Sequence, residues 1–233
     1  MIKNMLFVAM ITIVFSLSFV NIKVASQTNK AEQLKKLINN QPNFRATMIS
    51  SVSDFAKVDK ITHKDGLYLL EIIYHPSHLD SYSERLIYAS SGKTIIINDQ
   101  VKTYTLTELS EKIILRVGFQ MVGIDILAVD YYLKKKSPKL ETVGVVDIDS
   151  HKCTKVKATV DKRKTIFSEE LTYYLYFAQD LDNLIIKVDT EDEGLVYQFE
   201  KISLDNSNIT ADMFTIPVGY SKISNKFGVF YKD

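Results

Sequence analysis

ELTYYLYFA, residues 170–178, alternates apolar and polar side chains in a way that indicates the fold of the chain. One set of alternate positions holds Leu171, Tyr173, Leu175 and Phe177, whereas Glu170 and Thr172 belong to the other set. Successive side chains of a β-strand point to opposite faces of the sheet. The stretch therefore predicts a strand with one apolar and one solvated face, as is typical of antiparallel sheets.

The same alternation recurs in other segments. In residues 195–204, Leu195, Tyr197 and Phe199 oppose Gln198 and Glu200; in 152–161, Val156, Ala158 and Val160 oppose Lys155 and Lys157; in 140–149, Val146 and Ile148 oppose Asp147 and Asp149. Residues 67–74 (LYLLEIIY) are apolar on both sides, and Tyr68, Leu70, Ile72 and Tyr74 form the more uniform side. We expect these strands to share one sheet with one apolar face.

Runs rich in Tyr, Ile, Val and Thr predict eleven strands, at residues 44–50, 56–62, 67–75, 83–90, 93–98, 101–105, 140–149, 152–161, 170–178, 183–190 and 195–204. The breaks between most of them are short, such as KDG at residues 64–66 and DTEDEG at 189–194. Short breaks favour antiparallel neighbours, because parallel strands need long crossovers. A simple meander would bring the tips at residues 161–164 and 189–194 to one rim of the sheet.

Two segments have helical periodicity. Residues 29–39 place Ala31, Leu34, Leu37 and Ile38 on one side, and residues 105–136 begin with Thr105 and Glu108 at capping-box spacing. A sheet of so many strands tends to curl, and its apolar face needs cover. The predicted fold is mainly β with helices: a half-open antiparallel β-barrel of about eleven strands, covered by an N-terminal helix and a helical insert.

The N-terminus has the pattern of an export signal. Lys3 precedes an uncharged run from Met5 to Val20, and Val24-Ala25-Ser26 supplies a small-residue exit. We predict a signal peptide at residues 1–26 and a single domain at residues 27–233, in a protein exported to the periplasm. A retained membrane anchor is the alternative, although the run is shorter than the roughly 20 apolar residues that span a bilayer.

Charge and cysteine content limit the kinds of partner and modification that we expect. Of 29 basic and 28 acidic residues, Lys3 and Lys23 fall in the leader, so the remainder has a formal charge of −1. No nucleic-acid partner is expected, because such binding rests on neutralised phosphates. The only cysteine, Cys153, leaves no internal disulfide and lies far from the leader, so we expect no lipid-modified N-terminus.

The C-terminal stretch DMFTIPVGYSKI, residues 212–223, reads as a latch on the edge of the sheet. We expect Phe214 and Ile216 to be buried inside the barrel. Pro217 cannot donate to a strand ladder and so ends the pairing, and Gly219 permits a turn that returns Tyr220.

This ending, Phe-x-Ile-Pro-x-Gly-Tyr after LVYQFEKISL, resembles that of the lipoprotein-carrier (LolA/LolB-like) superfamily, and more closely that of its poorly characterised exported relatives. Residues 92–109 (GKTIIINDQVKTYTLTEL) and 145–160 (VVDIDSHKCTKVKATV) are similar to the family's strand-turn-strand before a helix and to its later hairpin. In all, the resemblance covers about residues 30–223.

The resemblance implies a protein of the lipoprotein-sorting type, whose barrel holds acyl chains in an apolar interior and is gated by helices between the middle strands. The chain departs from the family in having no tryptophan. Arg45 is the nearest candidate for the family's gating arginine.

Ten apolar-face residues are predicted to line a ligand cavity: Tyr68, Leu70, Ile72, Tyr74, Tyr88, Tyr173, Leu175, Phe177, Tyr197 and Phe199. The alternative is that helices fill the barrel and these side chains are core. Lys162, Arg163 and Lys164 are predicted to contact anionic head groups or an acidic partner at the rim, with a solvated loop as the alternative.

Patterns for catalysis, metals or cofactors are weak. His75, His78 and Asp80 read as a solvated loop, and His151 and Cys153 share a strand face without further ligands. The sequence has no serine elbow, P-loop, dinucleotide fingerprint or zinc helix. We therefore predict no enzymatic activity, no metal and no cofactor.

The prediction for function is an exported soluble protein that binds a lipid or a lipoprotein acyl chain inside the barrel, as a periplasmic carrier. The alternative is an envelope protein-interaction or sensor module that uses the same fold without a lipid cavity.

Overall fold

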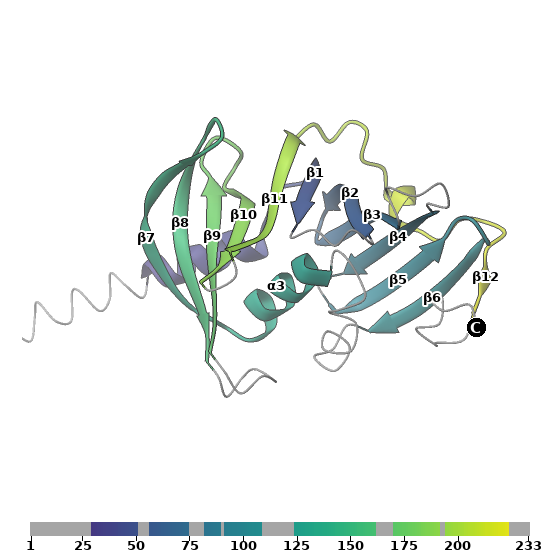
Figure 1. The fold of residues 1–233 in the computed structure, drawn as a ribbon, viewed down its shortest axis with the longest axis horizontal. Helices are drawn as coiled ribbons and strands as arrows, with labels where there is room; N and C mark the ends of the chain where they lie inside the picture. Colours follow the sequence, from purple (N-terminus) through teal and green to yellow (C-terminus); the bar gives the residue numbers. More distant parts are fainter. Residues whose placement is uncertain are drawn as a thin grey trace, which may run out of the picture. The chain divides into compact units, whose positions relative to one another are not determined.

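The computed structural model describes residues 29–50, 56–74, 82–89, 91–108, 124–161, 170–191 and 194–223. Within these ranges the strands form one open sheet of 12 strands in the order β12-β6-β5-β4-β3-β2-β1-β11-β10-β9-β8-β7 (Figure 1). All neighbours are antiparallel except β12 and β6. The predicted mainly β, half-open antiparallel architecture with helices is confirmed.

Two meanders build the sheet. The first contains β1 (Phe44–Ser50), β2 (Ala56–Lys64), β3 (Leu67–Tyr74), β4 (Tyr82–Ala89), β5 (Lys93–Asn98) and β6 (Thr103–Glu108). The second contains β7 (Lys139–Ile148), β8 (His151–Val160), β9 (Leu171–Ala178), β10 (Leu184–Thr190) and β11 (Gly194–Ser203). The predicted simple meander is wrong in one respect: β1 pairs with β11, which joins the two meanders at the middle of the sheet.

Two helices correspond to the predicted helical segments. Residues 29–39 are helical, as expected, and belong to a compact unit that ends at Asn39, whereas Asn40–Asp233 form a second unit that contains the sheet. The predicted covering role of the N-terminal helix stays a prediction. In the second unit, α3 (Ile124–Lys135) ends with Lys134 and Lys135, where cations favour the negative end of the helix dipole.

The start of the predicted helical insert is wrong. Thr105 and Glu108, read as a capping box, lie in β6, where they pair with Ile96 and Lys93 of β5. Thr103, Thr105 and Thr107 share one sheet face, and β-branched residues suit a strand. Pairing with β5 therefore makes this segment a strand, although its local sequence also fits the start of a helix. Residues 109–123, the middle of the insert, lie outside the described residues.

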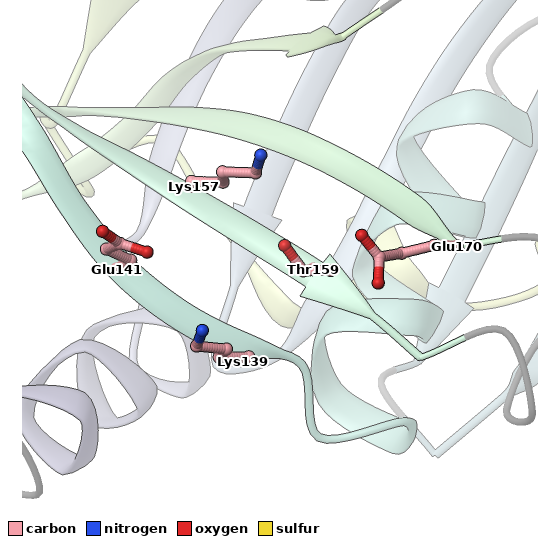
Figure 2. A pocket seen from close by; sticks show the side chains of 5 residues that line it. All are labelled: Lys139, Glu141, Lys157, Thr159 and Glu170. Carbon is pink, nitrogen blue, oxygen red and sulfur yellow. The ribbon is translucent and has the colours of Figure 1, made fainter.

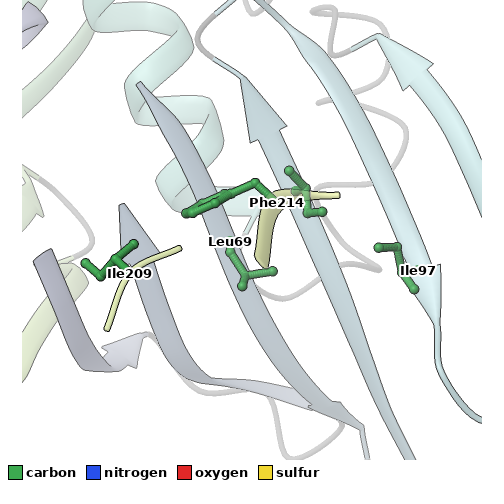
Figure 3. Packing of buried hydrophobic residues seen from close by; sticks show 5 residues of the cluster. Leu69, Ile97, Ile209 and Phe214 are labelled. Carbon is green, nitrogen blue, oxygen red and sulfur yellow. The ribbon is translucent and has the colours of Figure 1, made fainter. Parts of the chain in front are cut away.

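The C-terminal segment packs on a second, smaller core. Leu69, Ile87 and Ile97 lie on the sheet face opposite Leu70 and are buried together with Ile209 and Phe214 (Figure 3). Phe214 belongs to the 3₁₀-helix η2 (Ala211–Phe214). The expectation that Phe214 enters the barrel interior is wrong, because β3 to β5 carry apolar residues on both faces and this segment covers the second one.

The tail closes the edge of the sheet, as predicted, but the prediction that Pro217 ends the pairing is wrong, because the paired residues come after Pro217. After Gly219, β12 (Ser221–Lys222) pairs in parallel with β6, and Ser221 N donates to Lys102 O at 3.0 Å. The Tyr220 hydroxyl donates to Asp99 Oδ1 at 2.6 Å. The same carboxylate accepts two bonds from Arg85, at 2.8 and 2.6 Å, so one side chain ties the tail to β4.

Substituting Gly219 by alanine should lower the free energy of unfolding by about 1 kcal/mol, because an L-residue is strained in the left-handed region. Gly219 has φ +87°, and a Cβ at this position would meet nothing within 4 Å, so the cost is backbone strain and not a clash. Gly144→Ala is the control, since Gly144 has equally open space and no positive φ. Urea unfolding measures both; equal effects of the two substitutions would contradict the prediction.

Candidate functional site

All ten predicted cavity residues lie on one face of the sheet, and all ten are buried. In the first meander, strand register aligns Tyr88, Tyr68, His63 and Phe44 on this face. Pairing of β1 with β11 continues the face to Phe199 and Tyr197, and the next two strands add Val188 and Leu175. We call it the tyrosine face, after Tyr68, Tyr88 and Tyr197. That these residues contact a ligand stays a prediction.

A row of rings crosses the tyrosine face. From β4 to β11 the ring centroids are separated by 6.2 Å (Tyr88–Tyr68), 4.5 Å (Tyr68–His63), 5.6 Å (His63–Phe44), 5.1 Å (Phe44–Phe199) and 5.0 Å (Phe199–Tyr197). These spacings lie in the range of favourable aromatic pairs. The row gives the middle of the sheet a continuous apolar surface.

Helix α3 places a charged pair against this row. Lys134 Nζ lies 2.6 Å from Asp130 Oδ1, one helical turn apart, and only 11% and 9% of the two side chains are exposed. The Tyr68 hydroxyl donates to Asp130 Oδ1 at 3.5 Å, and the Lys134 ammonium lies 5.5 Å from the Tyr68 ring centroid. Burial, and then the Asp130 charge, raise the pKa of Tyr68, Tyr88 and Tyr197, which therefore stay protonated.

His63 is neutral in this environment. Its Nδ1 lies 2.7 Å from the Pro42 carbonyl oxygen, to which an N–H donates. Burial lowers the His63 pKa, although the bond to Pro42 opposes the shift. An uncharged imidazole suits its place between the rings of Phe44 and Tyr68.

Glu84 is a buried carboxyl on the same face. Register pairs it with Ile72 of β3 and Asn98 of β5, and it is 1% exposed. Asn98 Nδ2 donates to Glu84 Oε1 at 3.1 Å. Burial raises the Glu84 pKa to about 7, against the opposing effects of Asn98 and Tyr74. This group therefore changes charge near neutral pH.

Because of this shift, stability should fall by up to about 3 kcal/mol as the pH rises from 4.5 to 7, and level off above that. In this window the folded state keeps the Glu84 proton that the unfolded chain has released, so ionisation favours unfolding. Glu84→Gln should remove the slope while keeping an oxygen for Asn98. Urea unfolding at pH 5 and pH 8 measures it, with the half-exposed Glu71→Gln as control; an unchanged slope in Glu84→Gln would contradict the assignment.

The opposite face of β8 to β10 is polar. Lys155 lies over Tyr174 and Tyr176, with its Nζ at 4.3 and 5.3 Å from the ring centroids. The Tyr176 hydroxyl donates to Asp189 at 2.9 Å, and Lys187 lies 3.1 Å from the same carboxylate. The charges on this face are therefore largely compensated.

A surface pocket of about 230 Å³ opens on that polar face. Figure 2 shows its lining of Lys139, Glu141, Lys157, Thr159 and Glu170. Two cations face two anions there, so the pocket has no charge preference. It lies away from the predicted lipid-binding residues, which occupy the other face.

The other residues that the sequence singled out either lie outside the described residues or make local contacts. Lys162, Arg163 and Lys164, together with His75, His78 and Asp80, lie outside the described residues, as does the predicted signal at residues 1–26. His151 Nδ1 lies 2.8 Å from Asp180 Oδ2, and burial raises the pKa of Cys153 to about 11. The predicted gating candidate Arg45 donates to the Asn208 carbonyl oxygen at 2.8 Å.

The described part of the chain has neither a metal-binding cluster nor a membrane-spanning helix. No group of three or more His, Cys, Asp or Glu side chains there could hold a metal ion. None of the helices in these ranges is long and apolar enough to cross a bilayer.

Sequence reasoning missed Asp130, Lys134 and Glu84. The spacing of Asp130 and Lys134 marks a helical i,i+4 ion pair, but not its burial. In YSERLIYA, Glu84 shares alternate positions with Leu86 and Tyr88, a sign that it faces the core.

No protein-family model matches the sequence, and the search of curated proteins found no relative. Solved structures do match. An uncharacterized conserved protein from Thermus thermophilus (8% identity, TM-score 0.44) and LprF from Mycobacterium bovis (9%, 0.38) each cover 84% of this chain and 98% of their own. The Pseudomonas aeruginosa MucA/MucB complex (14%, 0.37) covers 75% of this chain, which spans 56% of the matched chain. The likeness concerns the fold alone.

Proposed function

We propose that this protein is exported and binds a lipid, or the acyl chain of a lipoprotein, against the tyrosine face. One observation carries the proposal: apolar and aromatic side chains form a continuous surface on one face of the sheet, from β4 across β1 to β9. Burying an acyl chain contributes about 0.8 kcal/mol per methylene. A chain of eight methylenes would thus gain about 6 kcal/mol without any specific polar contact.

Helix α3 is the part of the described structure that would yield to such a ligand. Its Asp130–Lys134 pair is nearly dehydrated, and charges regain solvation when they return to water. Part of the cost of moving α3 off the tyrosine face would be offset in this way. Leu127 and Leu133 of α3 are buried, and the acyl chain would then take the place of apolar side chains of this helix.

Native mass spectrometry of the protein, purified gently from the envelope, tests the proposal. A bound species of lipid mass that detergent removes is the expected result. Protein that is bare on purification, and still bare after incubation with lipids, would refute lipid binding.

The alternative function, recognition of a protein partner, is favoured by the edge strand β7. Among the described strands β7 pairs with β8 alone, and Val143 and Val145 on it are 54% and 53% exposed. An open edge with exposed valines is a place where a partner strand adds to a sheet.

Substitutions separate the two functions. If lipid binds the tyrosine face, Phe177→Ala should reduce lipid retention, and the pair Lys162→Ala and Arg163→Ala should not. A partner-binding module predicts the reverse, with loss of complex in the lysine–arginine variant or in Val145→Lys on β7. Lipid retention and complex formation are measured on the same three proteins, and no change in either would refute both functions.

A further inference from the structure

A group of polar side chains interrupts the tyrosine face near the β6 edge of the sheet. Glu84 of β4, Asn98 of β5 and Thr103 of β6 stand opposite one another in register, and Thr105 follows on β6. We call these four residues the polar corner. Register places them on the same face as Tyr68 and Leu70, in the rows that contain Ile72 and Leu86.

Part of the polar corner is already bonded. Asn98 Nδ2 donates to Glu84 Oε1, and Asn98 Oδ1 accepts from the backbone nitrogens of Gln100 and Val101, both at 3.1 Å. These three bonds fix the amide and hold the Glu84 carboxyl against β5. Asn98 therefore has a structural role that explains its burial.

Three oxygens of the corner, Glu84 Oε2, Thr103 Oγ1 and Thr105 Oγ1, make no hydrogen bond of good geometry in the described structure, although the Tyr74 hydroxyl lies near enough to Glu84 to favour its charged form. All three are sealed from solvent, and the Glu84 and Thr105 residues are 1% and 3% exposed. Buried polar atoms in native proteins are almost always hydrogen-bonded. Three such atoms on β4 and β6, on either side of Asn98 of β5, are better explained by a ligand than by the fold.

The chemistry of the corner selects the ligand group. In β3 to β6 the only cationic side chains, Arg85 and Lys93, lie on the opposite face, and Arg85 is bound to Asp99. A phosphate or carboxylate head group would therefore meet Glu84 with no cation to balance it. An ammonium would bring a full charge into a buried site that offers one carboxyl. Hydroxyl groups, which both donate and accept, fit a carboxyl and two threonines.

We propose that the polar corner binds the hydroxyl groups of an uncharged lipid head group, such as a glycerol monoester, while the acyl chain lies along the tyrosine face. The inference rests on the proposed lipid-binding function and assigns the class of lipid. It makes Glu84 and Thr105 specificity-determining residues.

The test compares two esters with the same acyl chain. Isothermal titration below the critical micelle concentration would give the affinities of 1-monooleoylglycerol, which has two free hydroxyls, and methyl oleate, which has none. The wild-type protein should bind the glycerol ester about tenfold more tightly, as expected for one or two added hydrogen bonds. Oleate, an anion, should bind less tightly than the glycerol ester.

Thr105→Val keeps the shape of the side chain and removes the hydroxyl. This substitution should reduce the preference for the glycerol ester over methyl oleate about fivefold and change the affinity for methyl oleate by less than about twofold. Thr105→Ser, which keeps the hydroxyl, should restore the preference. Thr107→Val, on the same strand and face, is the matched control. Glu84→Gln is a second variant, should Thr105→Val fold poorly by circular dichroism.

The outcomes separate the two proposals. Binding of methyl oleate with no preference for the glycerol ester would overturn the polar corner and leave lipid binding intact. A preference that survives both Thr105→Val and Glu84→Gln, or tighter binding of oleate, would also overturn it. Failure of every lipid to bind would overturn the proposed function and this inference together.

Discussion

Lys134→Ala should lower the free energy of unfolding by about 3–5 kcal/mol, because it leaves the buried Asp130 carboxylate without its cation. The pair is nearly enclosed, and Oδ2 of Asp130 has no hydrogen-bond partner in the described structure that could replace the ammonium. The contact from the Tyr68 hydroxyl, at 3.5 Å, is long, and a neutral hydroxyl does not replace the positive charge of Lys134. This loss is a large part of the free energy of unfolding of a typical domain, which is roughly 5–15 kcal/mol.

Urea unfolding monitored by circular dichroism measures this effect. Lys135→Ala is the control, because Lys135 is the next residue of α3 and is exposed; it should change stability by less than about 0.5 kcal/mol. The double variant Asp130→Leu with Lys134→Met should recover most of the loss, since buried pairs are often replaceable by apolar residues. A small effect of Lys134→Ala would mean that the pair is hydrated and that α3 is not seated on the tyrosine face.

Phe177→Ala should cost about 3–5 kcal/mol of stability, through lost burial and the cavity that is left. Phe177 is 1% exposed, and its strand β9 is paired on both sides, by β8 and β10, so the backbone has little freedom to close the gap. Thermal and urea unfolding measure the change. Val218→Ala, at a fully exposed position, should have almost no effect. A cost below about 1 kcal/mol would show that the site is already loosely packed.

The lower stability of Phe177→Ala also affects how its lipid retention is measured. Retention must be measured where the variant is still folded, well below its unfolding midpoint. Phe177→Leu serves as the milder variant, because it keeps most of the side-chain volume and should cost less. A lipid that is lost from Phe177→Ala but kept by Phe177→Leu would then report on the surface offered to the acyl chain and not on unfolding.

The individual strands were predictable from local pattern. Alternation in segments such as residues 170–178, with breaks such as Asp65-Gly66, placed most strands to within one or two residues. Asp65 and Gly66 have φ of 50° and 81°, as two-residue hairpin turns require. The beginning of the helical insert was misassigned, because a capping box and a threonine-rich strand look alike until the partner strand is known.

The residues of the candidate site also fall into those that were predictable from the sequence and those that were not. Its ten apolar and aromatic members were predictable, since alternation assigns each to a face. Its charged members were harder to find: alternation with Leu86 and Tyr88 places Glu84 on the core face, but no local pattern shows that Asp130 is buried. Their burial depends on Asn98 and Lys134, and on how strands and helix come together.

Local pattern predicted most of the strands and the apolar side of each, because a strand's side chains alternate with a period of two and no distant contact is needed. Tertiary structure alone decided how the faces join. Pairing of β1 with β11 merges two meanders, and η2 covers the second apolar face of β3 to β5. A bulge between Thr142 and Gly144 moves Val146 opposite Cys153, on the side of Lys155 and away from Val156. One extra residue reverses every later side chain of a strand, and only the partner strand determines where it is accommodated.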